Sequence, residues 1–157
     1  MNIDLVAATA SGPTELAAFD AALLATGLAN YNLIYLSSVI PPGAVLQHAE
    51  STDPGGAWGD RLYVVAAQHR TSTPGAQVWA GIGWVQNDST GAGLFVEHHG
   101  NHEDTVRNDI ELSLKGLMQG RNIDFGQIQV RITGGTCLGQ PLCALVAAAY
   151  ESRPWRT

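Results

Sequence analysis

The segment YNLIYLSSVIPPGA, residues 31–44, joins an apolar run, two adjacent serines and a pair of prolines. Residues 31–38 have the aromatic and branched composition that is typical of a β-strand. Pro41-Pro42-Gly43 ends that strand, because proline has no N–H group to donate to a sheet ladder. The sequence therefore places Ser37 and Ser38 at the end of the predicted strand. By itself the pair also suits two strand-end serines that bond to nearby backbone groups.

Upstream of this segment the sequence predicts one strand and one helix. Residues 3–8 are apolar and suit a strand, which Ser11-Gly12-Pro13 ends. Residues 14–26 suit a helix that stops at Gly27, a residue that favours the left-handed C-cap. The apolar face of this helix is predicted to consist of Leu16, Phe19, Leu23 and Leu24.

Downstream of the proline pair the sequence predicts a loop, four strands and a second helix. Residues 47–60 are polar and rich in glycine, as loops are. Asn101 is expected to cap the second helix, with Asp104 three residues later in the manner of a capping box. The strands are expected at residues 61–69, 77–85, 93–98 and 124–132. The helix continues on one apolar face with Val106, Ile110, Leu114 and Leu117.

The C-terminal part begins with a glycine-rich stretch, GGTCLG at residues 134–139. It resembles a phosphate-binding loop but lacks the Lys-Ser/Thr ending, so a tight turn is predicted. Pro141 is expected to open an alanine-rich helix that continues to about Tyr150. This order of elements is typical of an α/β or α+β protein whose helices cover sheet faces. We expect one domain over residues 1–157, which is enough chain for one core.

The composition excludes some partners. The net charge is −6 and the pI about 5.1, so neither nucleic acid nor an anionic membrane is expected to bind. No secretory signal and no membrane-spanning apolar run are expected from the hydropathy pattern. Cys137 and Cys143 are too few for a disulfide scaffold and lack zinc-ligand spacing. Buried thiols in a reducing cytoplasm are the expectation.

The serine segment resembles the processing site of the pyruvoyl-dependent arginine decarboxylases. The likeness runs over nearly the whole chain; it is dense in residues 14–44 and patchy between 45 and 90. The matching positions are Asn32-Leu33-Ile34 and Pro41-Pro42 around the serines, Ala18-Phe19-Asp20, Ala22-Leu23-Leu24, Gly27 and Asn30 upstream, and Gly93-Leu94-Phe95-Val96-Glu97 and Cys143-Ala144 downstream. The resemblance implies an α+β fold, a four-layer α/β/β/α sandwich formed by a single domain.

This resemblance implies that the chain makes its own catalytic group. The Ser38 hydroxyl attacks the Ser37 carbonyl, and the resulting ester is broken by β-elimination. The products are a β chain, residues 1–37, and an α chain, residues 38–157, whose first residue is a pyruvoyl group derived from Ser38. The pyruvoyl carbonyl forms a Schiff base with the substrate amine and accepts electron density as carbon dioxide leaves. No metal is expected.

Four other residues receive roles from the resemblance. Glu97 is the proton donor, which requires burial to keep it partly protonated. Asp20 contacts the substrate guanidinium, a natural match of carboxylate and donor fork. Asn32 orients the substrate carboxylate or the imine, and Ser37 carries a new C-terminal carboxylate after cleavage. Without the resemblance, Glu97 and Asp20 would be interpreted as solvated carboxylates and Asn32 as a strand amide bonded to backbone.

Two features depart from the family pattern. Gly43 stands where a larger, often acidic residue is expected, and His98-His99 follow Glu97 where aromatic or acidic neighbours are expected. His98 and His102 have metal-ligand spacing only if both lie on one helix, and Gly100 intervenes. A titrating segment near the active site is the preferred interpretation of the histidines.

The sequence therefore predicts a decarboxylase that converts arginine to agmatine and carbon dioxide. The resemblance also implies its partners: a small amino-acid substrate and further copies of the chain, in a homotrimer or a hexamer with active sites between protomers. Two alternatives stay open. One is the same chemistry on another amino acid. The other is an unprocessed, non-catalytic homologue that binds a small cationic ligand or serves as a structural subunit.

Overall fold

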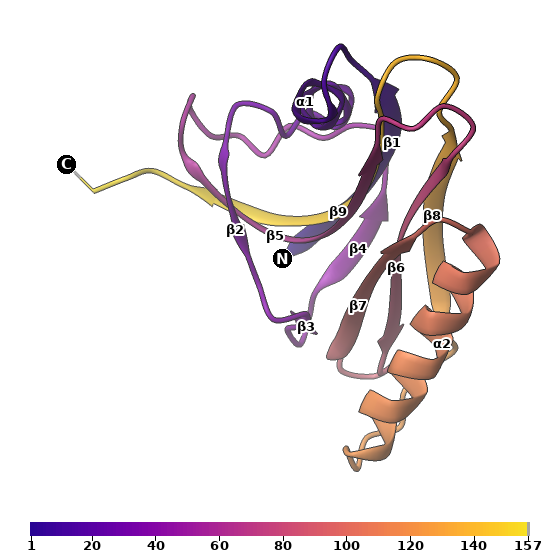
Figure 1. Ribbon diagram of the computed structural model, residues 1–157. Helices are drawn as coiled ribbons and strands as arrows, with labels where there is room; N and C mark the ends of the chain where they lie inside the picture. Colours follow the sequence, from indigo (N-terminus) through magenta and orange to yellow (C-terminus); the bar gives the residue numbers. More distant parts are fainter. Residues whose placement is uncertain (157) are drawn as a thin grey trace.

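The serine segment crosses from one β-sheet to another in the computed structural model, which describes residues 1–156 (Figure 1). Strand β2 (Asn32–Tyr35) belongs to a five-stranded sheet, and β3 (Val39–Ile40) belongs to a four-stranded sheet. The strand predicted over residues 31–38 thus ends at Tyr35, and the two serines lie in the crossing itself. This crossing places Ser37 and Ser38 between the sheets' edges rather than within a ladder.

The five-stranded sheet has the order β2-β5-β9-β1-β4. Its other strands are β1 (Asn2–Ser11), β4 (Val45–His48), β5 (Arg61–Thr71) and β9 (Leu142–Arg153). Strand β9 runs antiparallel to both β5 and β1, whereas β4 is parallel to β1 and β2 is parallel to β5. The loop predicted at residues 47–60 therefore begins two residues later, after β4 has paired with β1.

Strand β9 corrects the predicted alanine-rich helix after Pro141. The strand lies at the centre of its sheet, and Cys143–Ala149 are buried. Alternate residues pack against helix α1 on one face and against the second sheet on the other. A strand that is buried on both faces shows no polar alternation, and tertiary packing overrides the helix propensity of alanine.

The four-stranded sheet has the order β3-β7-β6-β8. It contains β6 (Gln77–Gln86), β7 (Gly93–Gly100) and β8 (Gln129–Thr136). The strand predicted at 124–132 is shifted toward the C-terminus, and the loop predicted at Gly134-Gly135 is part of β8. A Cβ atom at Gly134 would lie 2.3 Å from the Trp79 ring, so glycine serves close packing here rather than a turn.

Helix α1 (Glu15–Thr26) ends at Gly27 as predicted, but it begins one residue later than predicted and its buried face is different. Thr14 accepts from the Ala17 N–H at 3.0 Å, and Gly27 ends the helix at φ 84°. Leu16 and Leu24, which were predicted to face the core, are 67% and 61% exposed. The buried positions are Ala18, Ala22, Leu23 and Thr26, because small residues let the helix approach the sheet closely.

Helix α2 (Glu103–Gln119) begins one residue later than the predicted capping box allows. Its N-cap is His102 rather than Asn101, and no side chain bonds to the cap. The Asn101 side chain instead meets His69, with 2.8 Å between Oδ1 and Nε2. Val106, Ile110 and Leu114 are buried as expected, whereas Leu117 is 38% exposed.

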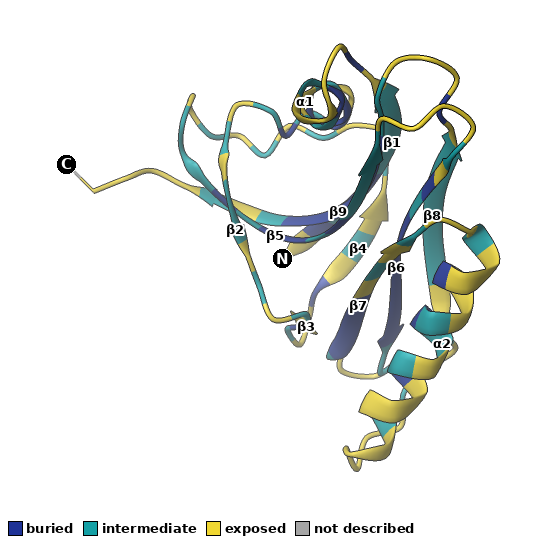
Figure 2. Ribbon diagram, viewed as in Figure 1, coloured by how far each residue is buried: buried dark blue, intermediate teal, exposed yellow. Residues whose placement is uncertain are grey.

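Three apolar clusters hold one α+β domain of two helices and two sheets together (Figure 2). The first lies between the sheets, the second between α1 and the five-stranded sheet, and the third between α2 and the four-stranded sheet. Helix α1 therefore covers the face of its sheet that points away from the other sheet. Within residues 1–156, no helix is long and apolar enough to cross a membrane.

Candidate active site

The backbone at Ser38 is held in a strained conformation. Its φ is 65°, and it is the only non-glycine residue among residues 1–156 with a positive φ. Such a conformation costs about 1–3 kcal/mol and persists only where the surroundings impose it. Two hydrogen bonds do so: the Leu36 N–H donates to Val64 of β5 at 2.9 Å, and the Phe95 N–H of β7 donates to the Ser38 carbonyl at 2.8 Å. The peptide between the serines is thus stretched between the two sheets.

The Ser38 hydroxyl is bound to the carboxylate predicted to work with it. Its Oγ donates a hydrogen bond to Glu97 Oε2 at 2.8 Å, across 59 positions of sequence. Glu97 points toward Ser38 because side chains alternate along β7: Phe95 and Glu97 share one face, while Val96 faces α2. Phe95 is fully buried between the sheets, so it fixes the strand that presents Glu97.

Tyr150 is a site residue that the sequence analysis missed. Its hydroxyl donates to the Val39 carbonyl at 2.9 Å, and its ring lies edge-on to Phe95 with 6.3 Å between ring centres. Burial, and then the charge of Glu97, raise the pKa of Tyr150, so the phenol stays a hydrogen-bond donor. Tyr150 therefore fixes the chain just after Ser38. Because the segment was predicted as a helix, no pattern placed this side chain beside the serines.

The two serines line two different cavities. Ser38 and Glu97 line a cavity of about 470 Å³ together with His98 and, from α2, Leu112 and Ser113. Ser37 lines another of about 460 Å³, whose walls include Tyr63, Tyr150 and Arg153. The peptide bond between the serines therefore separates two openings at the edge of the molecule. The Ser38 side lies at the first cavity, and Ser37, which precedes it, lies at the second.

Asp20 and Asn32 are not brought to Ser38 within one chain. Asp20 is exposed on α1, which lies on the outer face of the five-stranded sheet, and Figure 1 shows α1 at the top of the view and β3 well below it. Asn32 opens β2, six positions before Ser38, and donates from Nδ2 to the Gly59 carbonyl at 2.6 Å. Neither residue lines either serine cavity.

The histidines after Glu97 point in different directions. His98 faces α2, with 2.7 Å between its Nε2 and the Ser113 hydroxyl. His99 stacks on His69 of the other sheet at 5.1 Å between ring centres. Burial, and then the nearby His69 and His98, lower the pKa of His99. His102 lies before α2 begins, so the three histidines share no helix face, and residues 1–156 hold no cluster of three metal-ligating side chains.

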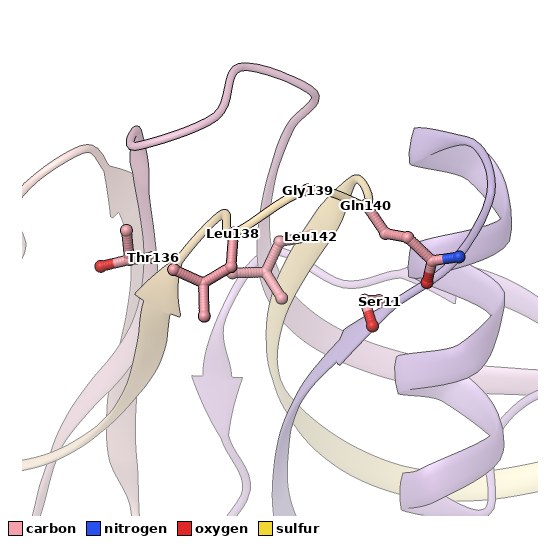
Figure 3. A pocket seen from close by; sticks show the side chains of 6 residues that line it. All are labelled: Ser11, Thr136, Leu138, Gly139, Gln140 and Leu142. Atoms are coloured by element: carbon pink, nitrogen blue, oxygen red, sulfur yellow. The ribbon is translucent and has the colours of Figure 1, made fainter.

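A further cavity, of about 360 Å³, lies far from this chemistry (Figure 3). It is formed at the β8–β9 loop and the end of β1, and its lining contains no titratable side chain. Its lining residues are Ser11, Thr136, Leu138, Gly139, Gln140 and Leu142. The serine crossing therefore remains the candidate active site.

Comparison with known proteins bears on this arrangement directly. The sequence profile described as "Pyruvoyl-dependent arginine decarboxylase (PvlArgDC)" matches residues 2–152. The chain belongs to the pyruvoyl-dependent arginine decarboxylase family. A Halobacterium salinarum pyruvoyl-dependent arginine decarboxylase is 37% identical over 140 residues, which cover 88% of this chain and 86% of that protein.

Two further proteins with the name pyruvoyl-dependent arginine decarboxylase are also similar to this chain over most of their length. The Thermococcus kodakarensis protein of that name is 33% identical over 144 residues, 88% of this chain and 87% of that protein. The Pyrococcus horikoshii protein is 35% identical over 116 residues, 71% of this chain and 72% of that protein. The similarity thus extends well beyond the serine segment.

Family membership implies a pyruvoyl cofactor, and the residues at the crossing fit its formation. A pyruvoyl group needs a serine whose oxygen can reach the preceding carbonyl, and Ser38 has both a strained backbone and a carboxylate partner for its hydroxyl. Ser37 is exposed, so water can reach the peptide that would be cut. Ser38, Glu97 and the Val39 carbonyl held by Tyr150 would surround the group.

Proposed function

We propose that this chain cuts itself between Ser37 and Ser38 and then decarboxylates arginine to agmatine and carbon dioxide. The observation that supports this most is the hydrogen bond from Ser38 Oγ to Glu97 Oε2 at the one strained serine. A serine hydroxyl is a weak nucleophile unless an adjacent base accepts its proton. Family membership points to the same reaction.

In the proposed self-cleavage, Ser37, Ser38 and Glu97 supply the reacting groups. Glu97 accepts the Ser38 hydroxyl proton as Oγ attacks the Ser37 carbonyl carbon, and the peptide C–N bond breaks to leave an ester and a free amine. Loss of the Ser38 Cα proton then expels the Ser37 carboxylate and leaves dehydroalanine. Water replaces nitrogen on its imine form, and ammonia departs. The chain 1–37 ends in a carboxylate, and the chain 38–157 begins with the pyruvoyl group.

In the decarboxylation, the pyruvoyl carbonyl supplies an electrophile that takes the substrate amine and accepts electron density as carbon dioxide leaves. The protein's own residues bind the substrate and move protons. Glu97 delivers a proton to the substrate carbon, and the Ser37 carboxylate lies beside it. Asp20 pairs with the guanidinium and Asn32 orients the polar end of the substrate.

Asp20 and Asn32 reach Ser38 only if a second protomer provides them. Support comes from their absence from the serine cavities and from exposed leucines at two places. Leu112 and Leu117 flank the Ser38 cavity, and Leu16 and Leu24 lie on α1 beside Asp20. We therefore propose a homotrimer, or a hexamer of two trimers, with each active site closed between protomers.

Two further properties belong to the same proposal. The order of the three apolar clusters supports a four-layer α/β/β/α sandwich for each protomer. A reducing cytoplasm suits the two cysteines, which are buried and free. Burial raises the pKa of the Cys143 thiol to about 11, so it stays protonated and unreactive.

Intact mass and carbon dioxide release test the proposal together. Purified protein is expected to give two fragments that separate after Ser37 under denaturing conditions, the larger with a blocked N-terminus. Among a panel of amino acids, arginine is expected to release carbon dioxide fastest. A chain that stays at 16.6 kDa after prolonged incubation contradicts self-cleavage. If the protein is cleaved but releases carbon dioxide fastest from another amino acid, only the assignment of arginine as the substrate is contradicted.

Replacing Asp20 by asparagine tests the guanidinium contact. A hydrogen bond to a charged group is worth about 1.5–3 kcal/mol, so Asp20→Asn is expected to lower kcat/KM for arginine about 10- to 150-fold. Self-cleavage should proceed at its normal rate, because the attack of Ser38 on the Ser37 carbonyl does not use Asp20. Glu15→Gln removes the same charge from the first turn of the same helix and is the matched control. Equal effects of the two variants would contradict the assignment.

A further inference from the structure

The C-terminal tail after β9 is fastened to the start of β5. The Trp155 indole Nε1 donates to the Gly59 carbonyl at 2.8 Å. The Arg61 guanidinium donates to the Pro154 carbonyl at 2.7 Å, and its Cζ lies 5.0 Å from the centre of a Trp155 ring. A cation over a tryptophan ring is attracted by the ring's negative face. Three contacts thus hold one exposed tryptophan in place.

The carbonyl that Trp155 binds also binds the proposed substrate-contacting amide. Asn32 Nδ2 donates to Gly59 O at 2.6 Å, so two side chains from opposite ends of the sequence meet on one oxygen. The position of that oxygen is set locally: Gly59 has φ 84°, and its N–H donates to the Asn30 carbonyl at 2.8 Å. A carbonyl oxygen has two lone pairs, which these two donors fill.

We propose that Trp155 is a positioning residue for the decarboxylation, acting through Gly59 on Asn32. An exposed asparagine on its own samples several rotamers, and fixing it costs entropy each time substrate binds. With Nδ2 committed to Gly59 O, the exposed amide has its Oδ1 left as an acceptor for the N–H groups of a cationic substrate. This inference rests on the proposed function, because it presumes that Asn32 contacts substrate.

The site of action separates this role from self-cleavage. Asn32 lies at the start of β2, paired with Arg61, whereas Ser38 follows the end of that strand and is bound from β7. Neither Trp155 nor Gly59 lines the cavities at the serines. A change at Trp155 should therefore alter substrate binding and leave the cutting of the chain unaffected.

Trp155→Phe tests the proposal, because phenylalanine is smaller but keeps an aromatic ring near Arg61 and removes the N–H donor. A neutral hydrogen bond contributes about 0.5–1.5 kcal/mol, so KM for arginine is expected to rise about 2- to 12-fold. The value of kcat should stay within about twofold of that of the unsubstituted protein, because losing an interaction made equally with the bound substrate and the transition state raises KM alone. Trp58→Phe is the matched control, since Trp58 is 83% exposed and no hydrogen bond joins its indole to residues 1–156.

A double variant decides whether Trp155 acts through Asn32. In an Asn32→Ala background, Trp155→Phe is expected to change KM no further, because the amide to be positioned is gone. If Trp155→Phe raises KM by the same factor in both backgrounds, or if the single variant has unchanged kinetics, the proposal is wrong. If the unsubstituted protein neither splits nor releases carbon dioxide, the proposed function fails instead, and the two failures are thereby distinguished.

Discussion

Ser38→Ala is expected to stay a single chain of 16.6 kDa and to release no carbon dioxide from arginine. Alanine has no oxygen to attack the Ser37 carbonyl and no leaving group to eliminate, so neither the cut nor the pyruvoyl group can form. The variant should still fold, because the Phe95 N–H bond to residue 38 uses the backbone carbonyl. Mass spectrometry of denatured protein after long incubation, together with carbon dioxide release, measures both losses.

The neighbouring serine provides the control for this experiment. Ser37→Ala keeps the carbonyl that is attacked, and the Ser37 hydroxyl has no part in the cleavage. That variant is expected to split into 1–37 and 38–157. Two fragments from Ser38→Ala would contradict the assignment of the nucleophile. Loss of cleavage in both variants, with a folded circular dichroism spectrum in each, would show that the pair acts in some way other than the one proposed.

Glu97→Gln is expected to have the second largest effect, and on two separate steps. Ser38 Oγ lies 2.8 Å from Glu97 Oε2. Glutamine can still accept a hydrogen bond from Ser38 Oγ but cannot take up its proton, so self-cleavage should be slower than in the unsubstituted protein. In the fraction that does mature, kcat for arginine should fall about 10²- to 10⁴-fold, the usual contribution of a general acid. Rates are normalised to the amount of cleaved chain, which separates the two losses.

The control for Glu97 is another glutamate that loses the same charge. Glu103 lies in the first turn of α2 and forms only an exposed ion pair with Arg107, which contributes little to stability. Glu103→Gln is therefore expected to cleave and turn over normally. A Glu97→Gln protein with full kcat once cleaved would remove the proton-donor role, and one that cleaves at the normal rate would remove the role as base.

The local signals in the sequence predicted the parts of the fold that depend on local physics. Helix α1 stops at Gly27, as predicted from that residue's preference for the left-handed C-cap. The apolar spacing of Val106, Ile110 and Leu114 likewise placed α2. What failed depended on contacts distant in sequence. The buried face of α1 and the closeness of β8 to Trp79 are decided by what packs against them, and no window of sequence contains that information.

In the candidate site, too, the features set by local sequence were predictable and those set by distant contacts were not. The serine pair and the break after it could be located from the segment alone, and the resemblance added Glu97, which the structure brings to Ser38 at 2.8 Å. Tyr150 was out of reach, because an alanine-rich run predicts a helix until its central place in a sheet is known. The distance of Asp20 from Ser38 within one chain also has no sequence signal, because it depends on which face of the five-stranded sheet α1 covers.

The order of strands in the five-stranded sheet has a consequence for the lifetime of the cleaved protein. The segment before Ser38 contributes β1 and β2, and β1 lies between β9 and β4, paired along Asp4–Ser11 with Ala149–Leu142. Cutting at the crossing would leave one sheet built from two polypeptides, in which β1 of the first is hydrogen-bonded on both sides to strands of the second. Once unfolded, however, the pieces would have to find each other by diffusion, so recovery would depend on concentration and compete with aggregation. The peptide link between the two segments helps to assemble the sheet and would be lost in the proposed cleavage, so the cleaved enzyme would be protected by slow unfolding rather than by an ability to refold.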